Sequence, residues 1–320
     1  MPHIVEVSAL AYKDLIETKR DQSIIATGVS GSGKTESLRY ALYHLVGMCA
    51  AIDDDQPPYP DCDDLTVHNT PGTYLPLSAY IAASDPIFEA FGNCVTQWND
   101  NSSRFAKFTE LCFDTSDEKS KLIGFNFRTY LLDTSSIVNT TKDASMDAQR
   151  SFHIFYALLA APMEFRRSLW PGAEHLNPSC FRYLGNTLMT EIENQTDEER
   201  FYTVFDALDT FGIDEKEKSS IWTSLCIVLQ LGNIMIGKEN SCDDSIRSFS
   251  TSAMDDVEIL GELMGVKGNE INEAMTMRTF SVSGHKRQVK LIKGEIMEHR
   301  DLFAKTVYYI TFDWLINRMN

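Results

Sequence analysis

The sequence carries, at residues 28–35, the stretch Gly28-Val29-Ser30-Gly31-Ser32-Gly33-Lys34-Thr35. This stretch satisfies the P-loop pattern G-x-x-x-x-G-K-[ST], in which backbone N–H groups and a helix N-terminus hold a nucleotide phosphate. In such a loop the lysine reaches the outer phosphate oxygens, and the threonine hydroxyl is a ligand of Mg²⁺. The pattern therefore predicts a site for a nucleotide and its Mg²⁺ at residues 28–35.

The flanks of the loop match the order of strand, loop and helix that a P-loop requires. Residues 23–27 (Ser-Ile-Ile-Ala-Thr) are a short β-branched run, which predicts a strand buried on both faces of a parallel sheet. After the loop, apolar residues at three- and four-residue spacing predict an amphipathic helix: Leu38, Ala41, Leu42, Leu45, Val46 and Cys49. The alternative is a glycine-rich turn without a ligand, and the correct flanks weigh against it.

Length, composition and charge limit the classes of protein to which this chain can belong. The chain has 320 residues, of which 43% are hydrophobic, so it can form a large packed core. A net charge of −17 argues against binding nucleic acid or an anionic membrane through bulk electrostatics. Seven scattered cysteines without a C-x-x-C pair, and no apolar run long enough to span a membrane, predict a reduced, cytoplasmic protein without structural zinc.

The rest of the chain divides into segments of different pattern. Residues 51–76 hold six aspartates among prolines, which is typical of a solvated loop; a metal-binding acidic cluster is the alternative, although the spacing lacks the regularity of a calcium loop. Two β-rich runs, 105–114 and 122–133, predict a hairpin that extends the sheet. From about residue 151 the periodicity becomes helical.

The closing stretch predicts an amphipathic helix. Residues 301–320 place one apolar face at helical spacing, and no glycine cap follows it, as expected of a chain that has been cut. The predicted buried face consists of Phe303, Val307, Ile310 and Trp314.

A second motif follows the P-loop lysine by about seventy residues. It reads Asn99-Asp100-Asn101-Ser102-Ser103-Arg104-Phe105-Ala106-Lys107. This motif resembles switch I of the myosin motor family, N-x-N-S-S-R-F-G-K. Further segments resemble that family in the same order, so that the resemblance covers nearly the whole chain: FEAFGN at 88–93, TYLL at 129–132, FHIFY at 152–156, LQLGNI at 229–234 and WLINR at 314–318. Taken alone, the motif could be a polar turn.

The resemblance implies a role for each polar residue of the motif. Ser103 would be the second protein ligand of Mg²⁺ beside Thr35, and Ser102 would contact the γ-phosphate and the attacking water. Asn99 and Asn101 would help to hold the nucleotide, which in this family is ATP. Arg104 would form one half of a salt bridge to a glutamate of switch II.

The resemblance also implies the fold class and the domain organisation. It implies an α/β fold: a P-loop NTPase core with a mixed central sheet over residues 1–150, including the acidic surface loop 51–76, and then a large, mainly helical layer. Residues 151–320 would be that layer, resembling the upper 50-kilodalton region, and the two parts together would form one incomplete motor domain.

Departures from the family pattern limit what the resemblance implies. Val29 stands where the family has glutamate, and Ala106 stands where it has a glycine, which is expected to stiffen switch I. The switch II pattern D-x-x-G-F-E does not occur in these residues, so the arginine's switch II partner is missing. We therefore expect no ATP hydrolysis by this chain alone, because phosphoryl transfer depends on positioning and electrostatics.

The function implied is the ATP-binding part of an actin-based motor, cytoplasmic and associated with the cytoskeleton. A basic cluster lies near the position of the family's actin-contacting loop: His285, Lys286, Arg287, Lys290 and Lys293. The alternative is a degenerate, non-hydrolysing nucleotide-binding or interaction module, such as a motor-like domain attached to another enzyme. A third interpretation, a small-molecule kinase or another P-loop NTPase, is disfavoured by the switch I motif and by the ordered resemblance along the chain. His44 and His153 lie in apolar helical stretches, which indicates structural residues rather than ligands.

Overall fold

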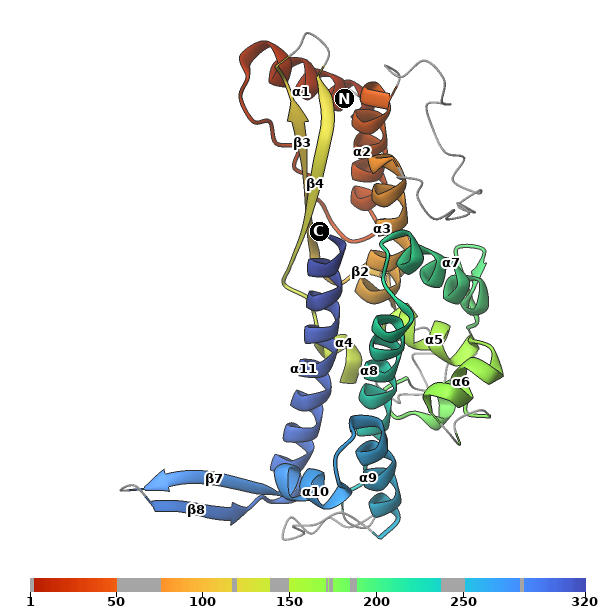
Figure 1. Ribbon diagram of the computed structural model, residues 1–320, viewed down its shortest axis with the longest axis vertical. Helices are drawn as coiled ribbons and strands as arrows, with labels where there is room; N and C mark the ends of the chain where they lie inside the picture. The colour runs from red at the N-terminus through yellow and green to blue at the C-terminus, as the bar shows by residue number, and fades with distance from the viewer. Residues whose placement is uncertain are drawn as a thin grey trace.

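Two long helices, α8 (Glu215–Asn233) and α11 (Lys293–Met319), run side by side along the molecule in this computed structural model (Figure 1). The structure describes residues 3–50, 76–116, 120–138, 150–170, 172, 175–184, 189–236, 251–282 and 285–320. One β-ribbon lies near the C-terminal end of α11, and another projects beside its N-terminal end (Figure 1). Of the acidic loop predicted at 51–76, residues 51–75 lie outside the described residues. Its last residue, Pro76, directly precedes α3.

The first part of the chain contains the helix predicted after the P-loop. Helix α2 packs against α1, and it buries Ala41 and Val46 of the predicted apolar stripe. The elements of this part are α1 (Ile4–Thr18), α2 (Lys34–Ala50), α3 (Leu77–Gly92), β1 (Asn93–Thr96), β2 (Asn99–Ser103), β3 (Ala106–Asp114) and β4 (Lys121–Tyr130).

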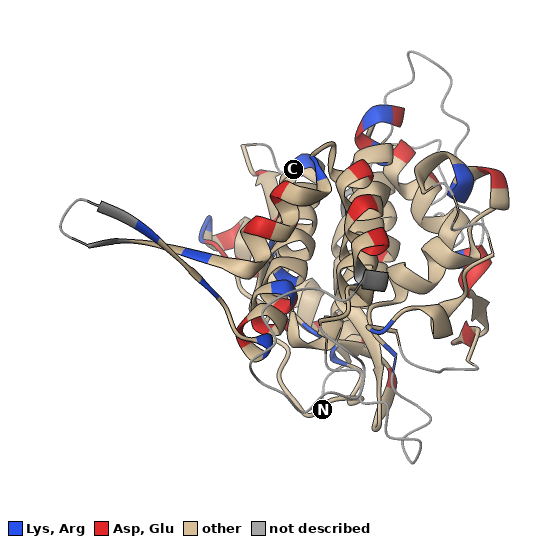
Figure 2. Cartoon of the chain, turned by 90° about the horizontal axis from the view of Figure 1, so that it is seen from below, with Lys and Arg blue, Asp and Glu red and all other residues tan. Residues whose placement is uncertain are grey.

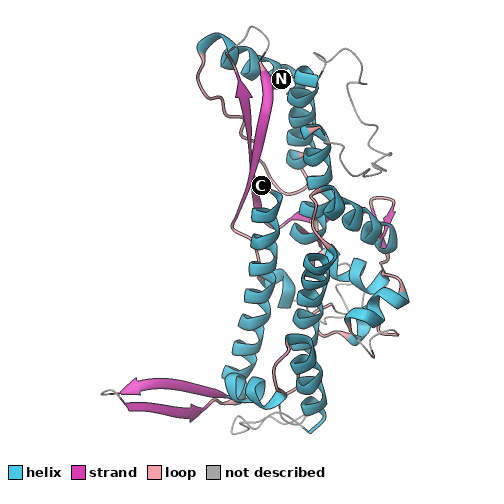
Figure 3. Cartoon of the chain, viewed as in Figure 1, coloured by secondary structure: helices cyan, strands magenta, loops and turns pink. Residues whose placement is uncertain are grey.

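The strands of the described residues form four separate two-stranded antiparallel sheets (Figure 3). Strands β3 and β4 confirm the predicted hairpin, but it stands as its own ribbon instead of extending a sheet. The predicted strand at 23–27 is wrong: these residues form no strand, and Ile25 is 82% exposed. A strand needs a hydrogen-bonded neighbour, and none of the described strands pairs with this segment. The mixed central sheet is therefore not confirmed.

Helices dominate the second part of the chain, as the periodicity predicts. Helix α7 packs on α3 and α5, while α9 packs on α8 and α10. The remaining elements are α4 (Ser135–Val138), α5 (His153–Ala160), α6 (Met163–Leu169), a 3₁₀ turn (Pro178–Cys180), β5 (Glu191–Ile192), β6 (Gln195–Thr196), α7 (Asp197–Thr210), α9 (Thr251–Met264), α10 (Gly268–Thr276), β7 (Met277–Val282) and β8 (His285–Lys290). Among the described residues, no helix has both the length and the apolar character to cross a membrane.

An aromatic cluster joins the two parts. Rings from α3, β4, the residue before α5, and α11 pack against one another: Phe88, Phe91, Phe127, Phe152, Tyr308 and Phe312. The Tyr308 hydroxyl donates to the Phe91 carbonyl at 2.6 Å, so its polar atom is satisfied inside the core.

The buried face of α11 differs from the predicted one. Ile310 is 58% exposed and Trp314 is 39% exposed, whereas Tyr308, Phe312 and Leu315 are buried. The aromatic cluster and α8 therefore determine which face of α11 is buried. The prediction from apolar spacing alone chose a neighbouring face of this helix.

Candidate nucleotide site

The P-loop has the backbone shape that its glycines allow. Gly31 and Gly33 have φ angles of +75° and +79°, a left-handed conformation that strains residues with a side chain. Helix α2 begins at Lys34, directly after the loop, so its free N–H groups face the cradle. The Lys34 ammonium donates to the Val29 carbonyl at 2.6 Å and so lies against the loop itself. Residues 28–33 are exposed, which leaves these groups accessible.

The β1–β2 hairpin brings the second motif to the P-loop. The Ser103 hydroxyl lies 3.4 Å from the Thr35 hydroxyl, and the Ser102 hydroxyl lies 3.4 Å from that of Ser30. Each pair joins one residue of the P-loop to one residue of β2. Four side chains predicted from separate motifs therefore meet at one place.

The pair Thr35 and Ser103 fits the requirements of Mg²⁺. This ion takes hard oxygen ligands at about 2.0–2.1 Å in octahedral geometry, so that two adjacent ligand oxygens lie about 2.9 Å apart. The two hydroxyl oxygens are 3.4 Å apart, which exceeds that spacing by about 0.5 Å. Both side chains are exposed, as ligands of an entering metal–nucleotide complex have to be.

The two asparagines of the motif are engaged within the protein. The Asn99 carboxamide oxygen accepts from the backbone N–H of Asn101 at 3.0 Å. The Asn101 carboxamide bonds to three side chains, those of Asn93, His153 and Glu193. The structure thus places Asn101 beside the predicted site, with its amide bonded to side chains of three other segments.

Arg104 has a partner inside the chain. Its guanidinium forms an ion pair with Asp133, and the Asp133 backbone N–H donates to the Arg104 carbonyl at 2.8 Å. Burial acts to raise the pKa of the Asp133 carboxyl, but hydrogen bonds from Arg104 and Ser135 outweigh it and lower that pKa overall. The resemblance pairs this arginine with a switch II glutamate; within this chain its guanidinium pairs instead with an aspartate 29 residues further along.

The remaining residues of the motif continue into the β3–β4 ribbon. Phe105 packs so closely on Gly92 that a Cβ at position 92 would lie 2.1 Å from its ring. Ala106 begins β3 and pairs with Tyr130 in the ladder. The predicted stiffening of switch I by Ala106 stays a prediction.

Sequence reasoning missed three residues of this site. Asn93, His153 and Glu193 touch the loop from β1, from α5 and from the turn between β5 and β6. His153 is fully buried and was expected to be structural, because its neighbours in the sequence are apolar. The one local signal was the turn Glu193-Asn194 directly before a helix-capping pattern, which points to an ordered hairpin but names no contact.

The basic cluster forms part of the projecting ribbon β7–β8. The side chains of Arg287 and Lys290 are exposed, as is that of Arg278 on the facing strand. Figure 2 shows basic residues along this ribbon, set apart from the acidic helices of the body. The side chains of His285 and Lys286 lie outside those described.

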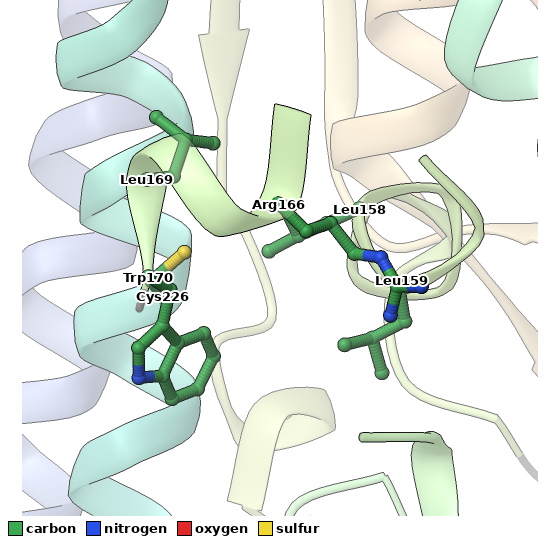
Figure 4. A pocket seen from close by; sticks show the side chains of 6 residues that line it. All are labelled: Leu158, Leu159, Arg166, Leu169, Trp170 and Cys226. Atoms are coloured by element: carbon green, nitrogen blue, oxygen red, sulfur yellow. The ribbon is translucent and has the colours of Figure 1, made fainter. Parts of the chain in front are cut away.

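A small cavity in the helical part does not qualify as a substrate site. Its volume is about 10 Å³, room for about one water molecule. It is lined by Leu158, Leu159, Arg166, Leu169, Trp170 and Cys226 (Figure 4).

Comparisons with known proteins agree with the motifs. A family model of the myosin head (motor domain) matches residues 1–320. The chain is 31% identical over 323 residues to Myosin-16 of Arabidopsis thaliana, covering 100% of this chain and 23% of that protein. It is likewise 31% identical over 324 residues to Myosin-15 of the same plant (100% and 19%) and over 319 residues to Myosin-52 of Schizosaccharomyces pombe (100% and 20%). The chain therefore spans about a fifth of the length of these relatives. On this evidence the chain belongs to the myosin motor-domain family.

Proposed function

We propose that this chain is the ATP-binding part of an actin-based motor, and that Thr35 and Ser103 hold the Mg²⁺ of Mg-ATP between the P-loop and switch I. The observation that carries the proposal is the 3.4 Å separation of these two hydroxyls, which two distant motifs supply. The bound ion would neutralise charge on the phosphate oxygens. In the complete protein we propose hydrolysis coupled to movement along actin, by analogy with the family.

The remaining residues take roles that their positions support. The P-loop backbone N–H groups and the start of α2 bind the β-phosphate, and Lys34 reaches the outer oxygens. Ser102, beside Ser30, contacts the γ-phosphate and orients the attacking water. Asn99 helps to hold the nucleotide. We also propose that residues 1–150 form the nucleotide-binding core and residues 151–320 the helical layer. The proposal includes a location in the cytoplasm, on the cytoskeleton.

Metal dependence of ATP binding tests the site. We expect Thr35→Ala and Ser103→Ala each to weaken ATP binding at least about tenfold in Mg²⁺ and to leave binding in EDTA nearly unchanged. Thr35→Ser keeps the hydroxyl and should stay close to the wild type. Lys34→Ala should weaken binding under both conditions, because its phosphate contact does not need the metal. Equal Mg²⁺ dependence in Thr35→Ala and Thr35→Ser would refute the assignment.

The ribbon β7–β8 supports actin as the partner. Arg278, Arg287 and Lys290 lie beside the partly exposed apolar side chains of Phe280 and Val289. A basic and apolar protrusion on an acidic body suits an acidic filament, which the rest of the surface would repel.

A non-hydrolysing nucleotide-binding module is the second candidate. The observation that favours it is the ion pair between Arg104 and Asp133, because this arginine is then engaged within the chain. ATP turnover separates the two candidates: the motor function requires hydrolysis that actin accelerates, and the alternative requires binding without turnover.

A further inference from the structure

The carboxamide of Asn101 lies at the centre of a hydrogen-bond network in the middle of β2. Its oxygen accepts from the Asn93 side chain at 2.8 Å and contacts His153 Nε2 at 3.2 Å. Its nitrogen donates to a Glu193 carboxylate oxygen at 2.7 Å. Three of the four hydrogen-bonding positions of this amide are thus used by side chains of three other elements.

The chemistry of the partners fixes every proton in this network. A carboxylate can only accept, so the nitrogen of the Asn101 amide has to face Glu193, and its oxygen has to face Asn93 and His153. His153 must then donate through Nε2–H, and its neutral form is therefore the tautomer in which Nδ1 is unprotonated. Burial, and then the positive charges of Arg200 and Arg150, lower the pKa of His153 well below its usual value and keep it neutral.

The turn that presents Glu193 is strained and braced. Glu193 and Asn194 have φ angles of +53° and +62°, and glutamate rarely adopts this left-handed conformation. The flanks hold the turn in place: Ile192 is buried, and Thr196 forms a capping box with Glu199 at the start of α7. A two-residue hairpin loop closed by Ile192 and Gln195 favours positive φ at both central residues, so the hairpin sets the conformation that presents Glu193.

We propose that Glu193 and His153 are positioning residues for switch I. They clamp the Asn101 amide, and thereby hold the next two residues, Ser102 and Ser103, facing Ser30 and Thr35. The proposal rests on the function proposed for the same site, because its consequence is tighter binding of the Mg²⁺ complex of ATP. It also changes the role of Asn101 from a ligand of the nucleotide to the anchor of the loop.

Two sets of variants separate the clamp from general stability. Glu193→Ala removes the acceptor, while Glu193→Gln keeps a carbonyl oxygen for the Asn101 amide. His153→Leu removes the donor, while His153→Gln keeps an N–H at a similar reach. Glu191→Ala is the matched control, because it removes an exposed carboxylate from the same small hairpin.

Two measurements apply to each variant of the purified protein. The first is backbone hydrogen exchange at residues 101–104 without nucleotide. The second is the ratio of ATP affinity in Mg²⁺ to that in EDTA, which depends on Ser103 but not on overall folding. We expect Glu193→Ala and His153→Leu to speed exchange about tenfold and to lower the ratio about tenfold. The two glutamine variants and Glu191→Ala should remain within about twofold of the wild type.

The other outcomes are decisive in different ways. If Glu193→Ala behaves as Glu191→Ala does in both measurements, the clamp does not exist. Faster exchange with an unchanged affinity ratio would show an anchor without a role in metal binding, which overturns the positioning role. Failure of the wild-type protein to bind ATP would refute the proposed function, whereas a difference in exchange between Glu193→Ala and Glu193→Gln would still support the anchor.

Discussion

Asp133 illustrates how one carboxylate organises the residues beside the candidate site. It pairs with Arg104, accepts from the backbone and hydroxyl of Ser135, and accepts from the Ser136 hydroxyl at 3.1 Å. Its pKa is lowered despite partial burial, so it remains charged at neutral pH and keeps the arginine in place. The end of switch I is thereby tied to the start of α4, and a partner that competes for Arg104 has to replace this ion pair.

At the same scale, His153 predicts a dependence of stability on pH. Its pKa is lowered well below 6.5 in the folded protein, mainly by burial and also by Arg200 and Arg150. Below about pH 6.5 the unfolded chain binds a proton at this residue and the folded chain does not, so acid favours unfolding. The free energy of unfolding should fall by up to about 1.4 kcal/mol per pH unit in this window through His153 alone.

Urea unfolding at pH 7.5 and pH 5.5 measures this effect. The wild type should lose about 1–1.5 kcal/mol more than His153→Gln over that interval, because glutamine does not titrate. The other histidines contribute equally to both proteins. An equal loss in the two would mean that His153 becomes protonated in the folded state.

At the scale of elements, the junction between α3 and β1 depends on a glycine. The Gly92 carbonyl accepts from the Arg104 backbone N–H at 2.8 Å, so α3 and switch I meet there. A Cβ at Gly92 would lie 2.1 Å from Phe105, whereas a Cβ at Gly124 of β4 would meet only Cys112, at 3.9 Å. We expect Gly92→Ala to lower the free energy of unfolding by about 1–3 kcal/mol through overpacking.

The matched control is Gly124→Ala, which makes an ordinary contact and should change stability by less than about 0.5 kcal/mol. Thermal or urea unfolding of the two variants gives the comparison. Equal stabilities would indicate that Phe105 moves aside at little cost.

Local patterns predicted the elements that local forces determine. The helix after the P-loop and the β3–β4 hairpin are formed at the predicted places, because amphipathic spacing and a polar turn specify them. The segment 23–27 has the composition of a strand, but a strand exists only beside a partner, which no local pattern reveals. The face of α11 was misplaced for a similar reason, since Tyr308 and Phe312 are buried by rings from distant segments.

The same limit applied to the candidate site. The two motifs identified the P-loop and switch I residues that the structure brings together. The clamp joins Asn101 to His153, 52 positions along the chain, and to Glu193, 92 positions along it. No spacing within a helix or strand encodes such contacts. The resemblance assigned Arg104 to a switch II glutamate, and it could not reveal that Asp133 also lies within reach of this arginine.

At the scale of the whole molecule, charge is divided between an acidic body and a basic ribbon. We expect Arg287→Glu combined with Lys290→Glu to weaken co-sedimentation with actin filaments about tenfold at low salt and to reduce its salt dependence. Reversing two exposed lysines elsewhere, Lys13 on α1 and Lys216 on α8, makes the same change in net charge and should have a smaller effect. Equal loss in both double variants would assign the binding to net charge and not to the ribbon.

Helix α11 also has a mechanical consequence. Its 27 residues form a rod about 40 Å long. At one end the rod meets the basic ribbon; at the other, the Asn320 side chain bonds the backbone N–H and carbonyl of Phe127, as a neighbouring strand would. A tilt of about 10° at the first end displaces the second by about 7 Å. The helix thus connects the basic ribbon to the edge of β4, whose partner β3 begins directly after switch I, and we expect a displacement of the ribbon to reach switch I by this route.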